Sequence, residues 1–82
     1  MSHEEYKSVE EKLVYMANQI AGFFQVMGHE AAVDGIADHI NKFWEPRMRS
    51  HFFEIIGRGG EGFNPLVLEA AAKVKRPKEA SV

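Results

Sequence analysis

The spacing of the apolar residues constrains the fold of this chain most, because they recur every three or four positions along most of its length. This spacing places them on one face of an α-helix. Ser8, followed three residues later by Glu11, fits a capping box and predicts a helix that begins near Val9. Gly28 is a natural helix end, since glycine tolerates a left-handed conformation. The apolar face predicted for this first helix consists of Leu13, Met16, Ala17, Ile20, Phe23, Phe24 and Met27.

The same reasoning predicts further helices after Gly28. A second helix should run from about 30 to 44, and Pro46 should end it and open a third helix that reaches about 56. The second half of that third segment, 51–56, also fits a strand. Glycines at 57–62 indicate a loop, after which Asn64 and Pro65 predict a short fourth helix. We therefore expect an all-α fold, a small bundle of three to four short helices.

The length of 82 residues fits one domain. We divide it into an acidic extension (1–8), a helical domain (9–74) and a basic tail (75–82) that we expect to be disordered. The N-terminus lacks the features of a signal peptide, and no apolar run approaches the ~20 residues of a membrane span. We therefore expect a cytoplasmic protein that does not bind membranes.

The residues that could carry chemistry are few. There is no cysteine, which excludes disulfides and cysteine-ligated iron–sulfur clusters. The glycines at 57, 59 and 62 fit a dinucleotide-binding pattern, but the chain after them is too short for a βαβ unit. His51 with Glu54, and His39 with its neighbouring aspartates, give too few convergent ligands for a metal. We expect no catalytic residue, no metal site and no cofactor in this chain, and the net charge of −2 argues against nucleic acid as a partner.

One block, residues 39–49, has the composition of a recognition site. It holds the only Trp beside a Phe, followed by a Pro and two Arg, and Trp and Arg are prominent at interface hot spots. We expect Phe43 to face inward, whereas Trp44 can belong to the core or to an interface. The two arginines can bind either a partner or the carbonyl groups at the end of the second helix. The predicted partner-binding residues are His39, Phe43, Trp44, Pro46, Arg47 and Arg49.

The sequence also contains three aromatic doublets, at 23–24, 43–44 and 52–53. Neighbours on a helix point about 100° apart, so both rings of a doublet cannot face one narrow core equally well. Either the core wraps around both rings, or one ring of a doublet stays exposed and anchors another protein.

Several strings of residues in this sequence resemble the delta subunit of NAD-dependent, molybdenum-containing formate dehydrogenases. The strings are Lys12-Leu-Val-Tyr-Met-Ala-Asn-Gln-Ile20, Ile36-Ala-Asp-His-Ile40 and Phe43-Trp-Glu-Pro-Arg-Met-Arg49, together with Gly59-Gly60 and Pro65-Leu-Val67. The resemblance covers roughly residues 12–74. It implies a non-catalytic accessory subunit of a cytoplasmic complex, which binds the large molybdenum-containing subunit and supports assembly, maturation or stability.

The resemblance further implies that molybdopterin, iron–sulfur clusters, flavin and NAD belong to the partner subunits and not to this chain. The alternative is a helical protein-interaction or DNA-binding regulatory module unrelated to formate oxidation. Self-association of the isolated chain into a homodimer is also open, because spare apolar surface favours it.

Overall fold

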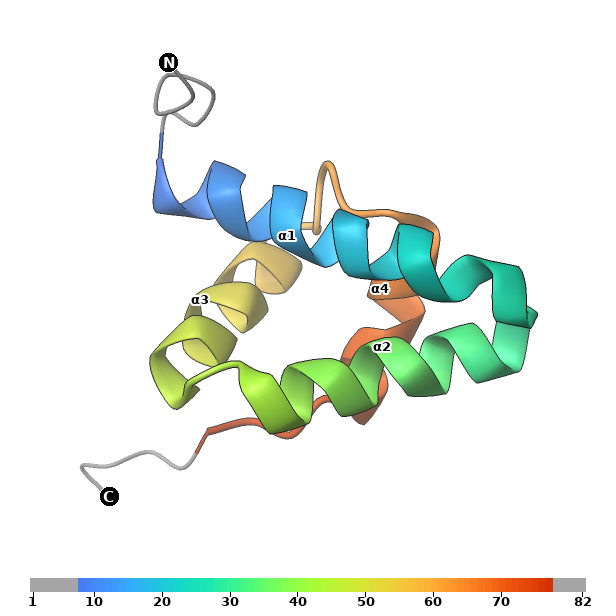
Figure 1. Ribbon diagram of the computed structural model, residues 1–82. Helices are drawn as coiled ribbons and strands as arrows, with labels where there is room; N and C mark the ends of the chain where they lie inside the picture. The colour runs from blue at the N-terminus through green and yellow to red at the C-terminus, as the bar shows by residue number, and fades with distance from the viewer. Residues whose placement is uncertain (1–7, 78–82) are drawn as a thin grey trace, which may run out of the picture.

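The computed structural model describes residues 8–77 and confirms the all-α prediction, with no strand in that range (Figure 1). Residues 1–7 and 78–82, and with them most of the predicted acidic extension and basic tail, lie outside the described residues. The helices are α1 (Val9–Phe24), α2 (His29–Phe43), α3 (Pro46–Gly57) and α4 (Pro65–Ala70). Two 3₁₀ turns, η2 (Gln25–Met27) and η3 (Ala71–Lys73), extend α1 and α4.

The helices begin where local side chains satisfy the free N–H groups of the first turn. Ser8 Oγ accepts a hydrogen bond from the Glu11 N–H at 3.1 Å, and Asn64 Oδ1 accepts one from the Leu66 N–H at 2.8 Å. Pro46 occupies the first turn of α3, as predicted. Gly28, with φ of 100°, separates η2 from α2. The strand alternative for 51–56 is wrong, because this segment is helical through to the end of α3.

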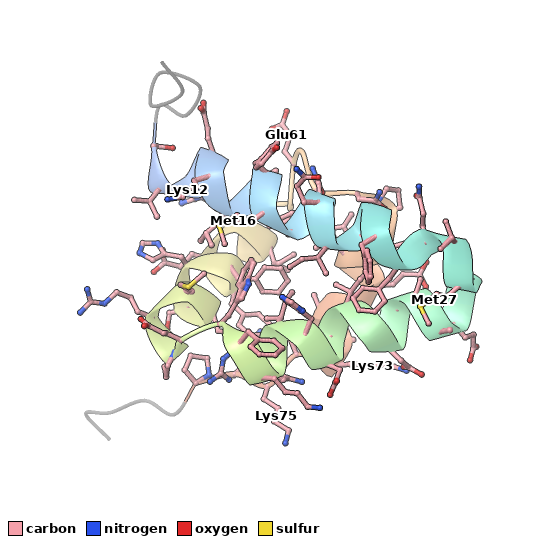
Figure 2. All side chains as sticks on the ribbon, viewed as in Figure 1. Lys12, Met16, Met27, Glu61, Lys73 and Lys75 are labelled. Carbon is pink, nitrogen blue, oxygen red and sulfur yellow. The ribbon has the colours of Figure 1, made fainter. Side chains whose placement is uncertain are left out.

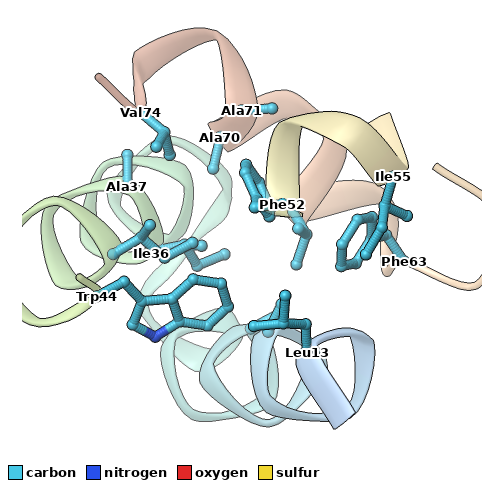
Figure 3. Close-up of a cluster of buried hydrophobic side chains, with 14 of the residues drawn as sticks. Leu13, Ile36, Ala37, Trp44, Phe52, Ile55, Phe63, Ala70, Ala71 and Val74 are labelled. Atoms are coloured by element: carbon cyan, nitrogen blue, oxygen red, sulfur yellow. The ribbon is translucent and has the colours of Figure 1, made fainter. Parts of the chain in front are cut away.

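The core lies where α1 and α2, an antiparallel pair, meet α3 and α4 (Figure 1). Helix α2 packs most extensively, against α4 on one side and α1 on the other. The large side chains that are fully buried are Phe52, Ile36, Ile40 and Val67. Figure 3 shows how all the helices contribute to this cluster. Within residues 8–77 no polar or charged residue is buried, so apolar packing holds the helices together.

The buried stripe of α1 differs from the predicted apolar face at three positions, because Ala21 is buried and Phe23 and Met27 are exposed. Its fully covered centre is formed by Leu13, Ala17 and Ala21. Phe23 and Met27, which we predicted on the apolar face, are 73% and 57% exposed. The small alanines at the centre let α1 approach its neighbours closely, and the large side chains at the helix end are left outside.

Two asparagines tie the C-terminal part of the chain to the first two helices. Asn18 of α1 donates to the Gly62 carbonyl at 2.9 Å and accepts from the Asn64 N–H at 2.7 Å. Asn41 of α2 does the same for the segment after α4, donating to the Lys73 carbonyl and accepting from the Lys75 N–H. Residues 75–77, which we assigned to a disordered tail, are therefore partly anchored to the helices.

Candidate partner-binding site at the α2–α3 corner

The predicted recognition block forms the corner between α2 and α3. Helix α2 ends at Phe43, and Trp44 leaves it in an extended conformation, with φ of −90° and ψ of 130°. Glu45 is also extended, and Pro46 then begins α3. The residue before a proline is driven out of the helical region, so this corner follows from the position of Pro46.

One of the two rings at the corner is exposed and the other is buried, and only the expectation for Phe43 is contradicted. Phe43 is 69% exposed, so the expectation that it faces inward is wrong. Trp44 is only 5% exposed and belongs to the core, where its ring meets Phe52 edge to face at 6.0 Å (Figure 3). The extended backbone at Trp44 explains why Trp44 is buried and Phe43 is exposed. It turns the indole under the end of α2, while Phe43 keeps its helical direction.

Phe43 forms a continuous surface with His39, one turn earlier on α2. Their ring centroids are 4.8 Å apart. His39 is half-buried and also lines a groove between α1 and α2, with Ile20, Phe23 and Phe24 on the opposite wall. The predicted residues His39 and Phe43 therefore lie together at the surface. They lie next to Phe23 of α1, which is not among the predicted partner-binding residues.

The two arginines of the block have different roles. Arg49 donates from Nε to the Trp44 carbonyl at 3.4 Å and from a terminal nitrogen to the Lys75 carbonyl at 2.7 Å. This is the structural alternative considered above, in which a guanidinium satisfies carbonyl groups at the end of α2. Arg47 is exposed, and its guanidinium forms no hydrogen bond or ion pair with any residue between 8 and 77. Pro46 is exposed beside it.

The other two doublets also divide between the core and the periphery. Phe24 is half-buried against Gly35 of α2, whereas Phe23 is largely exposed. Phe52 is fully buried, and Phe53 is half-buried with the Arg76 guanidinium 4.2 Å above its ring centroid. One ring therefore stays exposed in two of the doublets, at Phe23 and at Phe43, and its role as an anchor for another protein stays a prediction.

The described residues offer surface contacts rather than reactive groups. In the range 8–77 no three His, Asp or Glu side chains lie close enough to hold a metal ion. His51 and Glu54 are neighbours, with a nitrogen–oxygen distance of 3.7 Å, but no third ligand joins them. None of the helices in this range is both long and apolar enough to span a membrane.

Comparison with known proteins identifies the family. The family described as NADH-dependent formate dehydrogenase delta subunit FdsD matches residues 12–71, which is well over half of the chain and includes most of α1, all of α2, α3 and α4, and the corner. No significant match was found among curated proteins or among solved structures. On the strength of the family match, this chain belongs to the NADH-dependent formate dehydrogenase delta subunit family.

Proposed function

We propose that this chain is a non-catalytic accessory subunit of a cytoplasmic formate dehydrogenase, which binds the large molybdenum-containing subunit and supports its assembly, maturation or stability. Membership of the delta subunit family supports a place in such a complex. The observation that carries the binding role is the pair of surface rings at the α2–α3 corner, the exposed Phe43 and the half-buried His39. The family match also argues against a regulatory module unrelated to formate oxidation.

The cofactors of the reaction belong to the partner subunits in this proposal. Molybdopterin, iron–sulfur clusters, flavin and NAD are expected there. The residues of this chain do not suit the metal centres, because the sequence has no cysteine to ligate a cluster and residues 8–77 hold no cluster of metal-binding side chains. The role of this chain is then to recognise a protein surface.

Burial of the exposed Phe43 ring by a partner would contribute a measurable part of the binding energy. Complete burial of a phenylalanine side chain is worth about 1.5–3 kcal/mol. Because 69% of Phe43 is exposed, its burial should contribute about 1–2 kcal/mol, or roughly 5- to 30-fold in affinity. Arg47, exposed on the same corner, can add a contact to a carboxylate or a carbonyl group of the partner.

Co-purification tests the proposal. The complex is produced with a tagged form of this chain, and the amount of large subunit retained on the tag is measured for wild type, Phe43→Ala and Arg47→Ala. We expect wild type to retain the large subunit and Phe43→Ala to retain it about 5- to 30-fold more weakly. Ala31→Ser is a matched control, since Ala31 is exposed on the same helix but far from the corner. The proposal fails if wild type does not retain the large subunit and if omission of this chain leaves the amount and activity of the complex unchanged.

A further inference from the structure

Helix α1 carries an exposed face without charge. The sequence from Leu13 to Gly28 contains no Asp, Glu, Lys or Arg, although 27% of the residues of the chain are charged. One side of this stretch nevertheless faces solvent. The outer side of a surface helix normally carries charged and polar residues, so an uncharged outer side needs an explanation.

Five of the exposed residues of this stretch form one stripe along the helix and its 3₁₀ extension, which we call the α1 face. It consists of Tyr15, Gln19, Phe23, Val26 and Met27, of which the four apolar or aromatic members are 47%, 73%, 84% and 57% exposed, in that order. Gln19 donates a hydrogen bond to the Tyr15 hydroxyl at 2.5 Å. In Figure 2, Lys12 lies near the start of α1 and Met27 lies in the 3₁₀ turn that follows it, and the α1 face extends between them.

The α1 face continues into the α2–α3 corner. The groove between α1 and α2 is lined by Gln19, Ile20 and Phe23 on one side and by His39 on the other. His39 in turn contacts Phe43. The charged neighbours of these two residues on α2, Asp38 and Lys42, neutralise each other in an ion pair at 3.3 Å. The α1 face, the groove and the Phe43 ring therefore form one surface without net charge, and the exposed Arg47 lies beyond it on the corner.

Several charged side chains of residues 8–77 form ion pairs away from this surface. Arg58 bonds Glu10 at 2.6 Å, Lys73 bonds Asp34 at 2.5 Å, and the His29 ring lies 2.7 Å from Glu69. The hydrogen bond that the Arg58 guanidinium donates to the Glu10 carboxylate raises the pKa of Arg58. These ion pairs connect different helices around the ends and the α4 side of the fold. The occupant of the α1 face therefore meets aromatic, aliphatic and amide groups, and its own contact surface should be apolar and uncharged.

The area of this surface distinguishes a second copy from a larger partner. The exposed part of Phe23 supplies about 150 Å², the five members of the α1 face together roughly 500–600 Å², and Phe43 on the corner a further ~140 Å². A symmetric dimer through this face would bury only about 1,000–1,200 Å² in total, near the lower limit of stable interfaces. A larger partner that also covers the corner can reach the ~800 Å² per side of a standard interface.

We propose that the α1 face, with the adjoining groove, is the docking surface for an apolar, uncharged helix or ridge of the large subunit. This inference rests on the proposed function and assigns its main contact to α1, with the corner at the edge of the interface. An apolar helix that lies in a groove between two helices, anchored by residues spaced three and four apart, is a common mode of recognition.

Charged substitutions on the face test this assignment. Phe23→Lys and Val26→Lys each place an ammonium group where the partner surface should be apolar, and Ala72→Lys places the same charge on exposed η3 as the control. We expect the first two variants to lower retention of the large subunit by about tenfold or more, because an unpaired charge is buried on binding. Their melting temperatures should stay close to that of wild type, because both positions are solvent-exposed, and Ala72→Lys should bind normally.

The outcomes separate this inference from the proposed function. If wild type and both face variants retain the large subunit equally, the docking surface is wrong and the accessory role stands. If wild type itself retains no large subunit, both the role and the occupant are wrong. Light scattering of the isolated chain supplies the third arm: a stable dimer that Phe23→Lys and Val26→Lys dissociate, with retention of the large subunit unaffected, would assign the face to a second copy and overturn the proposal.

Discussion

The opposite orientations of Phe43 and Trp44 predict opposite consequences for two neighbouring alanine substitutions. Trp44→Ala should destabilise the fold severely, because the indole is 5% exposed and packs against Phe52. Phe43→Ala should have a small effect on stability and act mainly on partner binding, because 69% of its surface is already in water.

The magnitudes follow from the buried areas. A buried tryptophan removes up to about 250 Å² from water, which at ~25 cal/mol per Å² sets an upper bound of about 6 kcal/mol. Measured Trp→Ala and Phe→Ala changes in cores cost about 3–5 kcal/mol, the value we expect for Trp44→Ala. The buried third of Phe43 is about 60 Å², so Phe43→Ala should cost less than about 1.5 kcal/mol. A chain of this length has roughly 4–12 kcal/mol of total stability, so loss of the indole removes a large part of it.

Urea denaturation followed by far-ultraviolet circular dichroism measures both values, with thermal melting as a second readout. We expect the melting temperature of Trp44→Ala to fall by roughly 12–40 °C, since each kcal/mol shifts a domain of this size by about 4–8 °C. If the two variants differ in unfolding free energy by less than about 1 kcal/mol, or if Phe43→Ala is the less stable, the assignment of Trp44 to the core is refuted.

Two further pairs of variants test the packing and the corner. Gly35→Ala should destabilise the fold by about 1–3 kcal/mol, because an added Cβ would lie 2.5 Å from the Phe24 ring. In Gly22→Ala the added Cβ meets nothing within 4 Å, so this variant should stabilise α1 by about 0.5–1 kcal/mol. Chemical denaturation measures both changes. Equal effects at the two glycines would contradict the close approach of α1 and α2. Arg49→Met should cost about 1–2 kcal/mol of stability, because it removes the hydrogen bonds to two backbone carbonyls. Arg47→Met should change stability by less than about 0.5 kcal/mol. An equally large destabilisation by both variants would show that Arg47 also has a structural role.

The helix boundaries could be predicted from sequence because local interactions determine them. Ser8 and Asn64 cap α1 and α4 through bonds to N–H groups two or three residues away. Pro46 needs no partner to end one helix and begin the next. Such signals depend on a few neighbouring residues, and the fold does not override them here.

The orientation of the corner rings could not be predicted in the same way. A helical projection assigns residue 44 a direction as if it were still in α2, but Trp44 has already left the helix, and its side chain is placed by packing against α3. The exposure of Phe23 has a similar origin, since the centre of the buried stripe is set by Ala17 and Ala21, which let the helices approach. The roles of Asn18 and Asn41 depend on segments distant in sequence, and nothing near either residue indicates them.

The hydrogen bonds of Asn18 and Asn41 to distant segments affect the order in which the protein can fold during synthesis. Asn18 contacts residues 44 and 46 positions later in the chain, and the core that begins at Leu13 is closed only by Val67, Ala70 and Val74. Until those residues have left the ribosome, a nascent chain holds α1 and α2 with their core side uncovered. Long-range contacts of this kind form late. We therefore expect ribosome-bound chains that end before α4 to stay susceptible to protease, and resistance to appear in one step once the segment through residue 74 has emerged.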